Sequence, residues 1–371
     1  MDKVRIGVIG IGAMGSAHAN WLRDGNVPGA ELAAVCDPSP ERLKSLHGIP
    51  GYESSAELIR SGEVDAVVIA TPHYSHTSIG IDALQHGLHV MMEKPISVHK
   101  ADCERLIAAH KNPQQVFGAM FQLRTDPEFT KIRSLIISGE LGSIKRVNWI
   151  ATQWFRSDAY YASGTWRATW AGEGGGVLLN QCPHQLDLFQ WMFGMPARVR
   201  AHCTLGRYHS IEVEDDVTAY MEYPDGRTAV FITSTGESPG SNRLEIACDR
   251  GRLLYENGEL QFARTEVPVS EFCRKSKLGF APPPAWDVKI PLAIPGAGAK
   301  HVGILQNFVD AILTGAPLIA PAREGIHSVE LANTFLLSSM QGRTIELPLN
   351  AIEYEEHLEK LKSGSRAEKP K

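Results

Sequence analysis

The chain has 371 residues, 43% of them hydrophobic, and a formal net charge of −5 at pH 7. This length allows two domains, and the acidic balance argues against the basic surface that nucleic-acid binding needs. No stretch approaches about eighteen continuous apolar residues, so we expect neither a transmembrane helix nor a membrane partner. The six cysteines are scattered without a CxxC pair, which favours a reducing cytoplasm over a disulfide framework or a zinc site.

The first motif joins a predicted strand to a predicted helix. A β-branched run at 3–9 comes first, so we expect no secretory signal there. It leads into Gly10-Ile11-Gly12-Ala13-Met14-Gly15 and a helical pattern from 17 to 23. In this context the first glycine makes the turn, the second admits a pyrophosphate, and the third lets the helix pack on the strand. Free N–H groups at the helix start bind the phosphates, which predicts a dinucleotide site.

A carboxylate ends the second predicted strand, 31–37. Asp37 lies about twenty residues past the glycines, where it can accept hydrogen bonds from both ribose hydroxyls of the dinucleotide. It would repel a 2′-phosphate, so we predict NAD rather than NADP, and nearby Arg42 softens that preference. The alternative is a capping or turn residue beside Pro38.

The next predicted strand, 64–72, is buried on both faces and ends at a turn. The carboxyl ends of parallel strands face the ligand crevice, so we expect four residues here to line the dinucleotide. They are Thr71, Pro72, His73 and His76. The two histidines form an HxxH pair, but no nearby acid or thiol completes a set of metal ligands, so we predict no metal.

A lysine follows another strand of the predicted parallel sheet. Residues 88–92 lead into Glu93-Lys94-Pro95, and a last strand at 115–121 leads into Gln122. A lysine at the carboxyl end of a parallel strand lies at the mouth of the ligand crevice. We therefore predict that Lys94 faces the substrate, with a solvated surface lysine as the alternative.

An aromatic loop lies in the second half of the chain. It follows a predicted helix at 129–138 and an alternating, half-buried strand at 143–155. Residues 156–170 contain two arginines, two tyrosines and two tryptophans with little periodicity. Aromatic faces stack on apolar surfaces of a ligand and arginine donates to hydroxyls, so we expect this loop to close over a sugar. The alternative is that the rings pack as ordinary loop core.

Three glycines at 174–176 precede a helical pattern that contains Asn180, Pro183 and His184. Glycines let another group approach the backbone closely. Asn180 and His184 stand four apart, so on a helix they share one face. Pro183 implies either a helix start or a kink just before His184. The alternative to a functional site is a buried histidine bonded to a backbone carbonyl.

Closely spaced strands fill residues 197–263. The pairs Asp225-Gly226 and Asn257-Gly258 predict hairpin turns between them. Unlike the strands of the first third, these neighbours are antiparallel. They predict one wide sheet, with one face covered by helices and the other free to dimerise.

The last hundred residues are expected to complete this second domain. A proline-rich segment at 266–295 is expected to pass over the site, with Trp286 as a candidate contact. Amphipathic helices at 302–313 and 326–340 are expected to close the domain. The charged tail from 355 to 371 is expected to be frayed.

Four of these features together resemble one protein family. The glycine loop, Glu93-Lys94-Pro95, the Arg124-x-x-Pro127 turn and the stretch 174–184 occur in the order of the Gfo/Idh/MocA family of glucose–fructose oxidoreductase and inositol dehydrogenase-like enzymes. The resemblance covers roughly residues 3 to 345. It implies an α/β fold with an N-terminal Rossmann domain and a C-terminal α/β domain built on a large open, mostly antiparallel sheet. The predicted divisions are 1–122, 123–355 and a charged tail at 356–371.

The resemblance also implies roles for single residues. Lys94, which precedes a cis proline in the family, and His184 are implied to form the catalytic pair. The second domain is implied to carry the substrate site and the oligomer interface, with Trp166 and Arg167 in the pocket. Many family members have Asp where this chain has Asn180, and that departure removes one possible base.

The sequence thus predicts a cofactor site, a substrate site and a catalytic pair without a metal. The catalytic pair is Lys94 and His184. The cofactor residues are Gly10, Gly12, Ala13, Met14, Gly15, Asp37, Thr71, Pro72, His73, His76, Glu93, Lys94, Gln122, Trp166 and Arg167. The substrate residues are Lys94, Arg124, Arg156, Trp166, Asn180 and His184.

The predicted activity is NAD-dependent hydride transfer between a secondary hydroxyl of a sugar, glycoside or cyclitol and the nicotinamide. His184 is the expected base, Lys94 holds the oxygen as negative charge develops, and Asn180 orients a hydroxyl. One alternative is a glycosidase that uses tightly bound NAD for transient oxidation and elimination. A non-catalytic NAD-binding regulator is less favoured because Lys94 and His184 are both present. We expect a cytoplasmic homodimer or homotetramer with no nucleic-acid or membrane partner.

Overall fold

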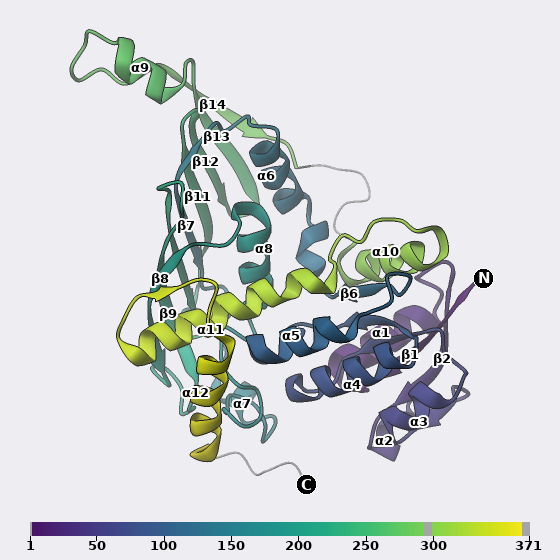
Figure 1. Cartoon of the computed structure of the whole chain (residues 1–371). Helices are drawn as coiled ribbons and strands as arrows, with labels where there is room; N and C mark the ends of the chain where they lie inside the picture. Colours follow the sequence, from purple (N-terminus) through teal and green to yellow (C-terminus); the bar gives the residue numbers. More distant parts are fainter. Residues whose placement is uncertain (1, 293–298, 366–371) are drawn as a thin grey trace.

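The computed structural model describes residues 2–292 and 299–365. Figure 1 shows two parts lying against each other, a smaller one that contains the N-terminus and a larger one built on a tall sheet. Within the described ranges, no helix combines the length and the apolar character needed to cross a membrane.

The smaller part is a six-stranded parallel sheet in the order β3-β2-β1-β4-β5-β6. This is the doubly wound order in which ligands bind where the winding reverses, here between β1 and β4. The predicted Rossmann-type sheet is therefore confirmed. Its strands are β1 Val4–Ile9, β2 Ala30–Cys36, β3 Gly51–Tyr52, β4 Ala66–Ile69, β5 His89–Met92 and β6 Phe117–Ala119, and the helices between them are α1 Ala13–Arg23, α2 Pro40–Lys44, α3 Ser55–Arg60, α4 His73–Gln85 and α5 Lys100–Ala109.

The larger part is a nine-stranded sheet in the order β14-β13-β12-β11-β7-β10-β9-β8-β15. Its neighbours are antiparallel except β7 and β10, which run parallel. The predicted, mostly antiparallel sheet is confirmed. Its strands are β7 Ile144–Ala151, β8 Arg198–Leu205, β9 Glu214–Glu222, β10 Thr228–Ser234, β11 Asn242–Cys248, β12 Gly251–Glu256, β13 Glu259–Thr265, β14 Ala285–Ile290 and β15 Ile345–Glu346.

Helices cover one face of this sheet, as Figure 1 shows for α6, α8 and α11. The alternation predicted for β7 places Val147, Trp149 and Ala151 in the core, where Trp149 stacks on Phe189 of α8. The uncovered face carries exposed side chains such as Tyr220 of β9. The remaining elements are η1 Gln122–Thr125, α6 Pro127–Ile137, α7 Asp158–Tyr161, α8 Pro183–Phe193, α9 Val269–Lys275, α10 Lys300–Thr314, η2 Ala322–Glu324, α11 Gly325–Gln341 and α12 Ala351–Ser363.

The helix predicted at 302–313 does not close the second domain. As α10, it packs Ile304, Phe308 and Val309 into the core of the parallel sheet, beside β1 and α1. The next helix, α11, joins the two parts, because Val329 lies in a core of the first domain and Phe335 in the core of the second. A helical apolar stripe shows that one face is buried, but it does not say which sheet buries it.

Two expectations for the C-terminal part of the chain were also wrong. Residues predicted as a frayed tail form most of α12, where Tyr354 and Leu358 are fully buried and Asn350 caps the first turn. The segment predicted to pass over the site instead projects from the far end of the sheet as α9 and β14 (Figure 1), and Trp286 is exposed there. Residues 293–298 and 366–371 lie outside the described ranges.

Candidate active site

The glycine loop after β1 leaves open space at its centre. Gly10 has a φ of 92°, and a Cβ on it would lie 2.8 Å from the carbonyl group of Ala70. A Cβ on Gly15 would lie 1.7 Å from the Gly10 carbonyl oxygen, whereas one on Gly12 would meet nothing within 4 Å. Only glycine therefore fits the first and third positions. The second faces open space at the N-terminus of α1, which suits a pyrophosphate.

Asp37 is held beside this loop at the end of β2. It is 2% exposed, and its Oδ2 accepts hydrogen bonds from Ile11 N at 2.8 Å and Arg42 at 3.2 Å. Its Oδ1 accepts one from Ser39 N at 2.9 Å, so the turn role considered from sequence is also present. A carboxylate fixed against the glycine loop suits the ribose of NAD.

The carboxyl end of β4 brings a second group of predicted residues to the crevice. Pro72 precedes α4, whose first turn contains His73 and His76. The Thr71 hydroxyl is buried without a partner among the described residues, and a buried hydroxyl of this kind is satisfied when a polar ligand binds. The glycine loop, Asp37 and this free hydroxyl together fit a dinucleotide.

The two histidines contact backbone carbonyls. The ring nitrogens of His76 lie 2.8 Å from the carbonyl oxygens of Thr71 and Pro95. His76 thus joins the end of β4 to the turn after β5. His73 Nδ1 lies 3.4 Å from the carbonyl oxygen of Glu173 in the second domain, and burial lowers the pKa of His73 to about 3. Its ring is therefore neutral near pH 7.

Lys94 links the two domains. The Lys94-Pro95 peptide is cis, as the family resemblance implies. Lys94 Nζ donates to the main-chain oxygen of Asn180 at 2.8 Å, and its backbone N–H donates to Glu93 Oε2 at 3.1 Å. Burial lowers the pKa of Lys94, while the charges of Glu93 and Glu173 oppose that shift. The ammonium is thus directed at the turn that precedes α8.

Glu93 fixes this lysine to the dinucleotide loop. Its Oε1 lies 2.7 Å from Nε2 of His18, which lies on α1. Burial would raise the pKa of Glu93, but the hydrogen bond and charge of His18, followed by the charge of Lys94, outweigh it and bring the pKa to about 2. The carboxylate is therefore ionised and binds the helix that starts at the glycines.

The glycine-rich stretch is a turn rather than the start of a helix. The N–H groups of Gly176 and Leu178 donate to the buried carboxylate of Glu214, and a Cβ on Gly176 would lie 2.0 Å from the Glu214 carbonyl oxygen. Helix α8 begins only at Pro183, the helix-start alternative of the sequence prediction. Asn180 therefore lies before the helix, and the expectation that it shares a helical face with His184 was wrong.

His184 lies in the first turn of α8 and is buried. Its Nε2 lies 3.0 Å from Nε2 of Gln122, and its Nδ1 has no partner among the described residues. Burial lowers the pKa of His184 well below 6.5, and the charge of Lys94 lowers it further. The imidazole is thus neutral, and Gln122 is placed to donate into its Nε2 lone pair. The backbone-bonded alternative does not describe this histidine.

The aromatic loop lies over the Asn180 turn. Two guanidinium groups contact the ring of Tyr160, with Arg156 at 4.9 Å and Arg167 at 4.6 Å from its centroid. Its hydroxyl accepts a hydrogen bond from Arg167 and lies 3.5 Å from the side-chain oxygen of Asn180. The half-buried Trp166 sets its ring against His73. Two of the predicted loop residues thus contact neighbours of the Asn180 turn, Trp166 through His73 and Arg167 through Tyr160.

Arg124 has different partners from those expected of a substrate residue. Its guanidinium forms two hydrogen bonds with Asp187, at 2.8 and 2.6 Å, and contacts Glu324 and the carbonyl oxygen of Ile319. Both side chains of the Arg124–Asp187 pair are 1% exposed. These contacts favour a role in holding η1, α8 and η2 together.

Four residues near the site were missed from the sequence. Glu173 directly precedes the three glycines, so its position in the sequence could have identified it as a site residue. Glu214 of β9 and His18 of α1 have no such local signal. His301 of α10 stacks on Trp21 and its charge acts on Glu93 and His184. They come from segments far apart in the chain, which sequence spacing does not bring together.

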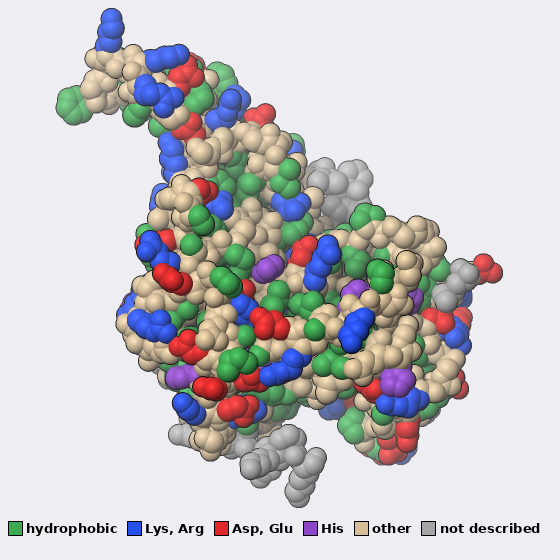
Figure 2. Space-filling view, viewed as in Figure 1, with side chains coloured by type: hydrophobic (Ala, Val, Ile, Leu, Met, Phe, Trp, Pro, Cys, Tyr) green, Lys and Arg blue, Asp and Glu red, His purple; other side chains and the backbone are tan. Residues whose placement is uncertain are grey.

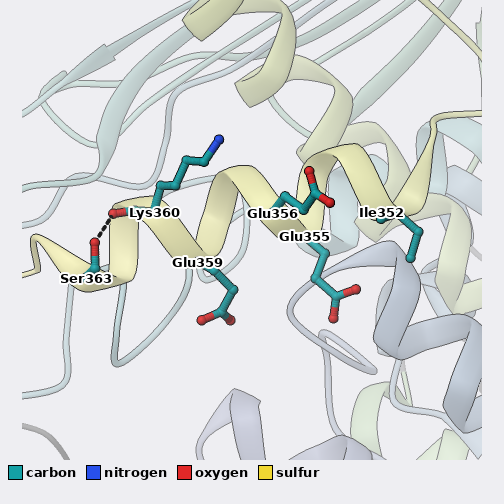
Figure 3. Close-up of a pocket in the computed structure, with 6 residues that line it drawn as sticks. All are labelled: Ile352, Glu355, Glu356, Glu359, Lys360 and Ser363. Atoms are coloured by element: carbon teal, nitrogen blue, oxygen red, sulfur yellow. Dashed lines mark hydrogen bonds between the residues drawn. The ribbon is translucent and has the colours of Figure 1, made fainter.

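A broad groove of about 680 Å³ lies elsewhere, along α12 (Figure 3). Its lining comes from Ile352, Glu355, Glu356, Glu359, Lys360 and Ser363. None of these residues belongs to the predicted sites. The groove is therefore separate from the residues gathered around Lys94 and His184.

Two sequence models of one family match the chain. Residues 4–121 match the oxidoreductase family with an NAD-binding Rossmann fold, and residues 129–254 match the GFO/IDH/MocA C-terminal domain. The rhizopine catabolism protein MocA of Rhizobium meliloti is 30% identical over 196 residues, which cover 52% of this chain and only 58% of that protein. An inositol 2-dehydrogenase of Rhizobium meliloti is 24% identical over 360 residues, covering 93% and 99% of the two chains.

The fold is also that of a solved dehydrogenase. The WlbA dehydrogenase of Bordetella pertussis, in complex with NADH and UDP-GlcNAcA, superposes with a TM-score of 0.80 at 23% identity, covering 94% of this chain and 100% of that one. Its likeness extends over both sheets, and the two family models cover the glycine loop and the strands of the wide sheet from β7 to β11 and part of β12. The chain belongs to the GFO/IDH/MocA family and is an NAD-binding oxidoreductase.

Proposed function

We propose that the protein is an NAD-dependent dehydrogenase that oxidises a secondary hydroxyl of a sugar, glycoside or cyclitol. The observation that carries the proposal is the meeting of two nitrogen groups from different domains. Lys94 Nζ binds the turn that leads into α8, and His184 lies in the first turn of that helix. The positive charge of Lys94 lowers the pKa of His184, and Glu93, the neighbour of Lys94 in the chain, contacts His18 of the helix that starts at the glycine loop. These observations support a substrate bound between the two nitrogen groups, beside the dinucleotide.

The groups present suit the transfer of a proton from an alcohol. Bound NAD supplies the carbon that accepts the hydride. As hydride leaves the substrate carbon, the O–H bond breaks and the proton passes to the neutral imidazole of His184, leaving a ketone. The Lys94 ammonium donates a hydrogen bond to the oxygen as its negative charge develops. His184 then releases the proton to solvent, and Asn180 orients a neighbouring hydroxyl.

Relatives support the substrate class. The inositol 2-dehydrogenase aligns over nearly the whole chain, and the WlbA dehydrogenase binds a nucleotide-linked sugar together with NADH. Cyclitols and sugars both present several secondary hydroxyls on a ring. A ring substrate also suits the half-buried Trp166 and the Tyr160 ring that two arginines contact.

A panel of sugars, inositols and glycosides tests the proposal with NAD and with NADP, by the absorbance of the reduced cofactor. We expect reduction of NAD by at least one polyol and much slower reduction of NADP. Cleavage of an aryl glycoside without net formation of NADH would contradict the dehydrogenase function and favour the glycosidase alternative. A protein that binds NADH but turns over no member of the panel would favour the regulator.

We also propose that the protein is a homodimer or homotetramer. Five large apolar side chains are exposed on the projecting arm of residues 266–290, where Figure 2 shows hydrophobic groups beside lysines and arginines. They are Val267, Leu278, Phe280, Trp286 and Val288. Such concentrations of exposed apolar surface mark contacts between proteins. Light scattering during gel filtration should give two or four chain masses, and a single chain mass would contradict the proposal.

A cytoplasmic location is part of the same proposal. All six cysteines are free, and four of them are buried. Free thiols persist in a reducing compartment, whereas secreted domains tend to pair them. Fractionation of the source cells checks this, and recovery outside the cytoplasm would contradict it.

A further inference from the structure

We propose that Glu173 is a positioning residue for Lys94, and that it supplies the carboxylate that position 180 lacks in this chain. The proposal rests on the dehydrogenase function above and deepens it. Glu173 directly precedes the three glycines, so it enters the site from outside the helix that carries His184. The proposed role involves no covalent step, because Glu173 acts through hydrogen bonds and charge alone.

The geometry connects Glu173 to Lys94 through a single residue. Glu173 is 2% exposed, and its Oε1 accepts a hydrogen bond from the side-chain amide of Asn180. The main-chain oxygen of the same Asn180 accepts the hydrogen bond from Lys94 Nζ at 2.8 Å. Ala168 N donates to the second carboxylate oxygen at 2.5 Å. Asn180 is thus held at its side chain by Glu173 while its backbone holds the ammonium.

The charges around Lys94 leave a role for this carboxylate. The groups that act on Lys94 are Glu93, Glu173, Cys182 and Arg156. Glu93 is already bound to His18 and to the backbone N–H of Lys94. Arg156 carries a like charge, which opposes protonation of the lysine. Glu173 is therefore the second anion that favours the ammonium form in a buried setting, where an unpaired charge is costly.

Asn180 and Glu173 form a matched pair. An amide at position 180 donates to the Glu173 carboxylate, which an ionised Asp at that position cannot do. Two carboxylates in contact would repel, and one of them would take up a proton. In this chain the carboxylate of that contact is at position 173 and the amide at position 180.

The test exchanges the carboxylate of Glu173 and the amide of Asn180, and measures the pH dependence of turnover. Lys94 acts as an ammonium, so activity falls as pH rises through its pKa. Glu173→Gln removes the anion, so we expect this alkaline limb to move to lower pH by about one unit. The double variant E173Q/N180D restores one carboxylate beside one amide, and we expect the limb to return toward its original position. Glu173→Asp keeps the charge and should leave the limb close to that of the unaltered enzyme.

Glu214→Gln is the matched control. Glu214 is also a buried carboxylate and holds the same turn through Gly176 and Leu178, but it is not among the groups that act most on Lys94. We expect it to lower turnover at every pH without moving the alkaline limb. If E173Q behaves like E214Q, or if the double variant fails to bring the limb back, Glu173 is only a structural support and the proposal is overturned.

A second readout does not need turnover. Reductive methylation with ¹³C-formaldehyde labels lysine amines, and Lys94→Arg identifies the signal of Lys94 in the NMR spectrum of the whole protein. We expect the pKa read from this signal to be lower in E173Q than in the unaltered protein, and to recover in E173Q/N180D. An equal pKa in all three would overturn the proposal. Absence of any oxidised substrate would instead count against the dehydrogenase function, so the two failures are distinguishable.

Discussion

The proposed mechanism depends on the protonation states of two residues. Burial, followed by the charge of Lys94, lowers the pKa of His184, so its imidazole is neutral near pH 7 and is our proposed base. Burial lowers the pKa of Lys94, and the charges of Glu93 and Glu173 oppose that shift; the proposed mechanism uses the ammonium form. The oxidation of an alcohol needs a neutral proton acceptor and a positively charged hydrogen-bond donor at its oxygen, and these are the roles that we propose for His184 and Lys94.

Removing either group should slow turnover while the cofactor still binds. Lys94→Ala and His184→Ala should each lower kcat by about 10²–10⁴, the usual worth of positioned acid–base assistance. The dissociation constant for NADH, measured by fluorescence, should change little because the glycine loop and Asp37 are untouched. Lys44→Ala and His86→Ala, at exposed positions, serve as controls. Near-full turnover in either active-site variant would remove that residue from the mechanism.

The acidic side of the pH profile should report His184. A base works only when it is neutral, so activity is lost as pH falls through its pKa. Because burial and Lys94 lower that pKa, the acidic limb of kcat/KM should lie below pH 6.5. Rates measured from pH 4.5 to 8 in buffers of constant ionic strength check this. A limb above 6.5 would mean that another group, or a charged His184, controls the step.

Asp37 should decide between the two cofactors. Asp37→Asn removes the charge that binds ribose hydroxyls and repels a 2′-phosphate, yet its side-chain oxygen can still accept from Ile11 N. Hydrogen bonds to a charged group are worth about 1.5–3 kcal/mol, so preference for NAD over NADP should fall roughly ten- to a hundredfold. The ratio of kcat/KM values measures this, with Asp24→Asn as a surface control. An unchanged ratio would mean that Asp37 does not select the cofactor and only stabilises the turn through Ser39 N.

At the scale of elements, regular patterns were predictable and the local turns were not. Local periodicity in the sequence predicted the strand–glycine–helix unit and the buried face of β7. The structure contains both. The Asn180 turn was predicted as helix, because its contacts come from distant residues: Lys94 bonds to the Asn180 carbonyl oxygen, and the Glu214 carboxylate, from a strand some thirty residues later, bonds to Gly176 and Leu178. Contacts between residues distant in sequence leave no mark in spacing, which is also why Glu173 was missed.

The joint between η1 and α8 depends on a buried ion pair. Arg124→Ala leaves the Asp187 carboxylate buried without its partner, and this typically costs about 3–5 kcal/mol. The free energy of unfolding, measured with urea, should fall by that amount. Arg133→Ala, at a more exposed arginine on α6, should cost much less. If R124A instead raises KM and leaves stability unchanged, Arg124 is the substrate residue that the sequence suggested.

At the scale of the whole molecule, the two domains are interlocked rather than consecutive. The chain builds the parallel sheet and the wide sheet in turn, but α10 returns to the first and α11 packs against both. The boundaries at 122 and 355 stay a prediction. The return of α10 brings the ring of His301 against that of His18, and the charge of His301 acts on Glu93.

The most direct test is a crystal structure with NADH and the polyol that the panel identifies. The account predicts that one substrate oxygen lies within hydrogen-bond distance of both Lys94 Nζ and His184 Nε2, with its carbon against the nicotinamide. Gln122 should then have given up its contact with His184 to that oxygen. A substrate oxygen that contacts neither nitrogen, or a dinucleotide bound away from the glycine loop, would contradict it.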